Sequence, residues 1–109
     1  MSKRLAREIH KLYPGETRII SVGCSGLLDS GELLSSVVSI TPAAGAPAAS
    51  SGQVSASPLR ISGELVVAGA ALLFEAEHAG EDVGEYEYDI RVTTTAGQVI
   101  SGTVVIDVQ

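Results

Sequence analysis

The stretch from Val83 to Val108 constrains the fold most, because apolar and polar side chains alternate along it with a period of two. One face of the predicted strand carries Tyr86, Tyr88, Ile90, Val92 and Thr94, and the other carries Glu87, Asp89, Arg91 and Thr93. This alternation is typical of a half-buried antiparallel strand. Ala96-Gly97 predicts a tight turn, in which Gly97 adopts a positive φ. The returning strand presents Ile100, Val104, Ile106 and Val108 to the same face, with Gly102 as a gap. We therefore expect a β-hairpin around which the chain is organised.

The remainder of the sequence predicts further short strands rather than helices. The expected strands cover residues 16–24, 33–41, 59–62, 65–69 and 70–76, with turn-forming Gly, Pro and Ser between them. Residues 42–58 are small and uncharged, which predicts an irregular connection in which Val54 marks a short edge strand. A chain of 109 residues forms one domain. The expected fold is all-β, an antiparallel β-sandwich of about seven strands over residues 15–109.

The first 14 residues differ in character from the acidic remainder and are expected to form a separate basic arm. Residues 1–18 hold five of the seven basic side chains, whereas residues 19–109 hold only Arg60 and Arg91 against eleven acids. The spacing of Leu5, Ile9 and Leu12 places them on one helical stripe, which Pro14-Gly15 would end. The arm is expected to bind a partner protein, in helical or extended form, through seven residues: Lys3, Arg4, Leu5, Arg7, Ile9, Lys11 and Leu12. The acidic body argues against a nucleic-acid partner.

Two tyrosines at the start of the penultimate strand are candidate structural residues. Immunoglobulin-type sandwiches keep a tyrosine here whose hydroxyl group hydrogen-bonds to the preceding crossover. Tyr86 is the first candidate and Tyr88 the second. The alternative is that both tyrosines face the core and leave their hydroxyl groups in solvent.

No combination of residues predicts catalysis, a cofactor or a membrane span. His10 and His78 lie far apart in sequence, and neither is near the single Cys24, for which we expect a buried, reduced thiol. The acidic residues between Glu75 and Asp89 lack the spacing of a calcium loop, which favours a solvated face. No apolar run reaches the roughly 18 residues of a transmembrane helix, and no signal peptide is expected. The sequence therefore favours a protein that is not an enzyme.

The order of these pieces resembles a family of small virion proteins. The matching positions are Leu28, Ser30-Gly31-Glu32, Val37 to Thr41, Tyr88, Thr93 to Thr95 and Ala96-Gly97, within residues 14–108. They are similar to immunoglobulin-like virion proteins of tailed bacteriophages, the fibre-tail adaptors. The chain departs from that pattern at Cys24, where many relatives have an aromatic residue, and in the basic arm before Pro14.

The resemblance implies a structural protein that connects tail or portal components to fibres. Its partners would be other virion proteins (portal, tail adaptor or fibre) present in multiple copies, with assembly in the bacterial host cytoplasm. A capsid decoration protein is the alternative within the structural class. A carbohydrate- or cell-surface-binding module is a weaker one, because such modules usually expose aromatic side chains and this chain has few.

Overall fold

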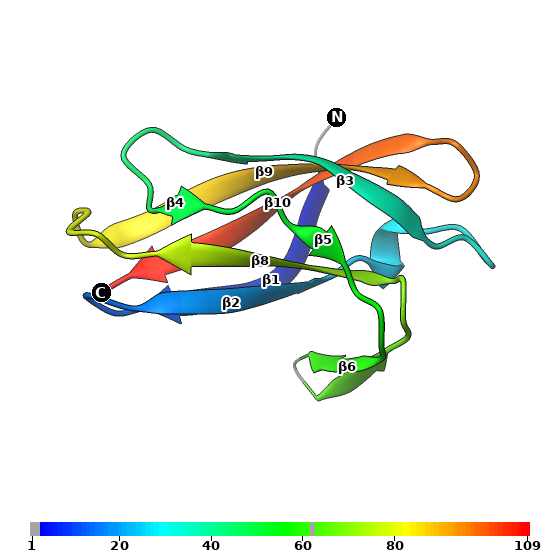
Figure 1. Ribbon diagram of the computed structural model, residues 1–109, viewed down its shortest axis with the longest axis horizontal. Coiled ribbons are helices and arrows are strands. Elements are labelled where there is room, and N and C mark those ends of the chain that lie inside the picture. The colour runs from blue at the N-terminus through cyan, green and yellow to red at the C-terminus, as the bar shows by residue number, and fades with distance from the viewer. Residues whose placement is uncertain (1–2, 62) are drawn as a thin grey trace.

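The computed structural model describes residues 3–61 and 63–109, and the side chains of residue 10 onward except that of residue 62. The described chain is a β-sandwich of two facing sheets (Figure 1). Sheet A contains, in spatial order, β1 (Lys3–Leu12), β10 (Val99–Val108), β9 (Gly84–Thr94) and β3 (Leu34–Pro42). Sheet B contains β2 (Thr17–Gly23), β8 (Ala71–Glu77) and β4 (Ala48–Ala49), and β5 (Gln53–Val54) also pairs with β8. A two-stranded hairpin of β6 (Leu59–Ile61) and β7 (Glu64–Val66) and a 3-10 turn, η1 (Ser25–Leu27), complete the described elements.

The predicted hairpin is β9 and β10, paired antiparallel without a break. Tyr88 lies opposite Val104, Ile90 opposite Gly102 and Val92 opposite Ile100. The expected inward residues from Tyr88 to Thr94 are buried, while Glu87, Asp89 and Arg91 are exposed. Gly97 in the turn has a φ of 81°, as its predicted role requires. The period of two thus predicted both the register and the buried face.

Sheet B supplies the other half of the core. Ile20 and Val22 of β2 and Leu72, Phe74 and Ala76 of β8 are all at most 2% exposed. The Phe74 and Tyr88 rings meet across the sandwich with centroids 5.9 Å apart. Aliphatic side chains dominate this cluster, as the composition predicts. The core therefore joins the two sheets through side chains of β2 and β8 on one side and of β9 and β10 on the other.

Of the two forms expected for the N-terminal arm, helical and extended, the structure has the extended one, and this segment is part of sheet A rather than detached from it. Residues 3–12 form strand β1, which pairs in parallel with β10, and Leu12 at its end is fully buried in the core. An isolated helix of this length is only marginally stable in water. Pairing with β10 instead satisfies the backbone hydrogen-bonding groups along one edge of the strand. The boundary between an arm at 1–14 and a sandwich at 15–109 therefore does not hold for β1.

Pro14-Gly15 is a tight turn between β1 and β2 rather than a hinge. Gly15 has a φ of 78°, and the Glu16 amide donates to the Tyr13 carbonyl oxygen at 3.1 Å. The Glu16 carboxylate in turn accepts a hydrogen bond from the Tyr13 amide at 2.8 Å. Proline followed by glycine with positive φ is the type II turn preference. The turn lets β1 leave sheet A and β2 enter sheet B.

Strand β3 differs from its predicted alternation because it contains two extra residues. Ser35 and Val38 have no partner on β9, since the register shifts between Leu34 and Ser36 and again between Val37 and Ser39. Each β-bulge reverses the faces that follow it. Val37 and Ile40 therefore both pack against the core, whereas uninterrupted alternation would place Val37 on the face opposite Ile40, with Ser39 and Thr41.

Candidate functional site

The connections that follow β2, β5 and β9 gather at one end of the sandwich, on the right in Figure 1. A groove of about 510 Å³ lies there, between the segment that joins β2 to β3 and the turn that follows β7. Its apolar walls are Leu28, Leu33, Val67 and Ala70, and Asp29 and Glu32 add carboxylates. Leu33 and Val67 remain 37% and 56% exposed. Apolar side chains left in water beside charged ones are typical of a protein-binding surface.

The Glu32 carboxylate fixes the shape of the groove. It accepts a hydrogen bond from the Thr94 hydroxyl at 2.6 Å and one from the Asp29 amide at 3.1 Å. These two hydrogen bonds, that of Thr94 first, lower the pKa of Glu32 below its ordinary value, because both favour the charged form. The groove therefore has a negative charge that is tied to the end of β9.

The β6–β7 hairpin extends the exposed apolar surface beside the groove. Figure 1 shows it projecting away from the two sheets. A small second cluster attaches it to the body, with Val66, Ala70 and Ala71 buried against Leu59 and Ile61. Leu65, on the outer side of the hairpin, is 65% exposed. The hairpin is thus attached to the body through its buried side chains, such as Val66, and presents exposed ones, such as Leu65, to solvent.

The sequence does not predict this groove. Its residues come from two loops that are 34 or more positions apart in sequence, Leu28 with Leu33 on one side and Val67 on the other. The only local signal is Leu33, whose neighbour Leu34 is buried in the core while Leu33 is not. The Ser30-Gly31-Glu32 turn lies within the local sequence, but the hydrogen bond between Glu32 and Thr94 of β9 forms only in the folded chain.

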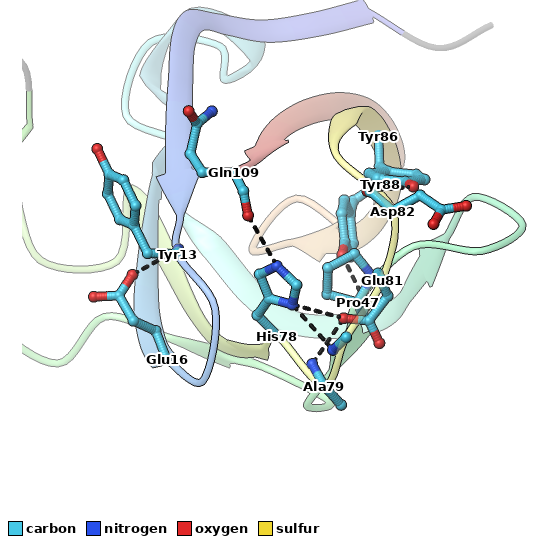
Figure 2. Close-up of polar contacts among 11 residues, drawn as sticks. Tyr13, Glu16, Pro47, His78, Ala79, Glu81, Asp82, Tyr86, Tyr88 and Gln109 are labelled. Carbon is cyan, nitrogen blue, oxygen red and sulfur yellow. Dashed lines mark hydrogen bonds and ion pairs between the residues drawn. The ribbon is translucent and has the colours of Figure 1, made fainter.

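The opposite end of the sandwich contains the two tyrosines, shown in Figure 2. The Tyr86 hydroxyl donates to the Asp82 carbonyl oxygen at 2.7 Å, which is the contact expected of a tyrosine that braces the preceding crossover. The Tyr88 hydroxyl donates to the Pro47 carbonyl oxygen at 2.6 Å, and burial raises the pKa of this fully buried side chain. Neither hydroxyl group is left to solvent alone, so both residues are structural.

His78, at the same end, connects three parts of the chain (Figure 2). Its Nδ1 accepts a hydrogen bond from the Gly80 amide at 3.2 Å, so Nε2 carries the proton and donates to the Gln109 carbonyl oxygen at 3.1 Å. The Glu81 carboxylate lies 3.3 Å from Nδ1. The His78 amide donates to the Glu16 carbonyl oxygen at 2.9 Å. The ring therefore fastens the 78–83 loop to the end of β10.

The proposed arm residues do not gather at the groove. Lys3, Arg4, Leu5, Arg7 and Ile9 lie along β1, whose backbone pairs with β10, and their side chains lie outside the described part of the structure. Lys11 is exposed in a register position opposite Asp107, and Leu12 belongs to the core. The fold therefore assigns Leu12 to stability and leaves the other six as a strand at the edge of sheet A.

Cys24 is expected to resist thiol reagents in the folded protein. It is 1% exposed next to Val22, and burial raises the pKa of its thiol to about 12, which removes the reactive thiolate at neutral pH. We expect labelling by a thiol-reactive dye to follow global unfolding, so that a denaturant sufficient to unfold the chain accelerates it strongly. Rapid labelling without denaturant would contradict this packing.

Within residues 3–61 and 63–109 no group of three or more metal-ligating side chains comes together. No helix in the same part of the chain is long and apolar enough to cross a membrane. No family model matches the sequence, and no curated protein does.

Proposed function

We propose that this chain is a non-enzymatic structural protein of a tailed-bacteriophage virion, an immunoglobulin-like adaptor that joins tail or portal components to fibres. The observation that carries the proposal is the groove between the β2–β3 segment and the turn after β7, where Leu33 and Val67 are exposed beside Asp29 and Glu32. Protein-binding surfaces combine an apolar centre with a polar rim in this way. The motifs in residues 14–108 supply the link to virion proteins.

The strand arrangement supports the immunoglobulin-like part of the proposal. Strands β2, β8 and β4 share one sheet, and β3, β9 and β10 share the other, which matches the B-E-D and C-F-G sheets of that fold. The hydrogen bond from Tyr86 to Asp82 occupies the position of the tyrosine corner. In this assignment the groove lies among the loops that immunoglobulin variable domains use for recognition.

The chemistry of the groove defines the segment that it would bind. Its walls are apolar, and Asp29 and Glu32 lie among its lining residues, in a chain whose net charge is −6. A partner segment with a basic side chain next to apolar ones matches this combination, because burying the apolar groups strengthens the ion pair that forms beside them.

A Val67→Lys variant tests this surface. The new charge opposes a basic partner and places an ammonium group in the apolar wall, so we expect binding to weaken by about tenfold or more. The measurement is the shift in elution volume when the purified chain is mixed separately with the portal, tail-adaptor and fibre proteins of the same virion. Val83→Lys is the matched control, because Val83 is 76% exposed on the loop at the opposite end.

The proposal predicts a complex with one of the three proteins that Val83→Lys retains and Val67→Lys loses. Absence of a complex with all three would reject the adaptor function. A complex that both variants retain would reject the groove as the binding surface.

A further inference from the structure

Strand β2 is the edge of the sandwich that is best formed for pairing with another strand. It is the outer strand of sheet B, and all seven of its residues pair with β8 without a register shift. The other described edges are interrupted. In sheet A, β1 shifts register between Arg4 and Ile9, and β3 has two bulges and ends at Pro42. In sheet B, β4 and β5 are two residues long. Bulges, prolines and very short strands are the usual protection against edge-to-edge pairing, and β2 has none of them.

The outer face of sheet B next to this edge combines apolar and acidic side chains. Ile19 is 64% exposed and lies opposite Glu75, and Thr17 lies opposite Glu77. A depression of about 370 Å³ next to Ile19 is lined by Leu73 and Gln53. A strand added to β2 would place alternate side chains over this face, where apolar and basic groups would find complementary partners.

The first half of β1 has that pattern. Residues at odd positions share one face of an extended strand, so Lys3, Leu5 and Arg7 would alternate between basic and apolar on that face. Pairing of this half with β10 is interrupted. Lys3 and Arg4 pair with Gly102 and Thr103, after which residues 5–8 lie opposite the single residue Val104 before Ile9 pairs with Val105. Pairing resumes there and continues to Leu12, which holds the second half in the core.

We propose that the edge of β2 binds the first half of β1 from a second copy of this chain. Residues 3–8 of one copy would leave the interrupted pairing with their own β10 and add a strand to sheet B of the neighbour. Six extended residues span about 20 Å, which matches the length of β2. Each copy donates one strand and accepts another, so the contact joins copies head to tail into a ring or an open chain. This contact lies outside the groove and does not depend on the function proposed for it.

Self-association of the full-length protein, followed by sedimentation velocity over a range of concentrations, tests the proposal. We expect Ile19→Lys to weaken association by about tenfold or more, because it sets a positive charge against the basic strand. Val99→Lys is the matched control, since Val99 is a β-branched strand residue that is 60% exposed on sheet A. It should associate like the wild-type chain. A wild-type chain that stays monomeric at its highest soluble concentration, or an Ile19→Lys chain that associates normally, would overturn the proposal.

A mixing experiment distinguishes this contact from symmetric pairing of two β2 edges. The Ile19→Lys variant can no longer accept a strand at β2 but can still donate residues 3–8. The Arg7→Glu variant can no longer donate these residues but can still accept a strand at β2. Each variant alone should be monomeric, with a thermal midpoint near that of the wild-type chain. Their mixture should form a heterodimer and no larger species. If both variants are folded and monomeric yet fail to combine, the two edges meet in another way and the proposal is wrong.

Discussion

Replacing Leu12 with alanine is expected to lower the free energy of unfolding by about 2–5 kcal/mol. Leu12 is 0% exposed and packs within the main core cluster, so the truncated side chain would leave a cavity between the two sheets. The backbone hydrogen bond from the Gln109 amide to the Leu12 carbonyl oxygen, at 2.9 Å, is kept by alanine, so the loss comes from the side chain. Chemical denaturation followed by circular dichroism measures the change.

Leu65→Ala is the matched control for this experiment. It removes the same atoms from a side chain that is 65% exposed on the β6–β7 hairpin, and surface changes of this kind stay within about 0.5 kcal/mol. Equal, small effects of the two substitutions would mean that residues 3–12 are an arm outside the domain. A deletion of residues 2–12 should likewise destabilise the sandwich, because it removes both β1 and its contribution to the core.

Ile90→Ala is expected to cost about 2–4 kcal/mol, because the site cannot easily collapse around the missing atoms. Ile90 is 2% exposed in the middle of sheet A, with Ile40 opposite it on β3 and Gly102 opposite it on β10. Glycine provides no side chain to fill the space. Thermal unfolding should show a midpoint lower by about 4–8 °C for each kcal/mol lost at this domain size.

Ile19→Ala is the corresponding control, because Ile19 is 64% exposed on the outer face of sheet B. Its expected effect on the free energy of unfolding is below about 0.5 kcal/mol. If Ile19→Ala destabilised the protein more than Ile90→Ala, the inward and outward faces of the strands would have been assigned the wrong way round.

The strands that alternate without interruption could be predicted from the sequence, because burial of one face requires an apolar residue at every second position. The register of β9 with β10 is an example: Tyr88 and Val104 are both inward residues, counted from the turn at Gly97. In β3 the same reasoning failed after Val37. A bulge is set by how the strand pairs with β9, and the serines around it carry no apolar signal that would reveal a change of face.

The misinterpretation of β1 has a different physical origin. Leu5, Ile9 and Leu12 fit a helical stripe, yet a strand is equally compatible with a sequence in which basic residues separate the apolar ones. The decision depends on the free edge of β10, which lies at the other end of the sequence. Local sequence patterns cannot predict the groove for the same reason, since its two walls come from loops that lie next to each other only in the folded chain.

The parallel pairing of β1 with β10 also determines the order of events during folding. Lys3 meets Gly102 and Leu12 meets Val108, so these contacts join opposite ends of the sequence. Contacts of such long separation form slowly, because the loop between them must be closed first. During synthesis β1 emerges from the ribosome before β10, so β1 has no partner strand in sheet A until β10 has followed it. Sheet A is therefore completed only when β10 becomes available, late in the sequence order of its four strands.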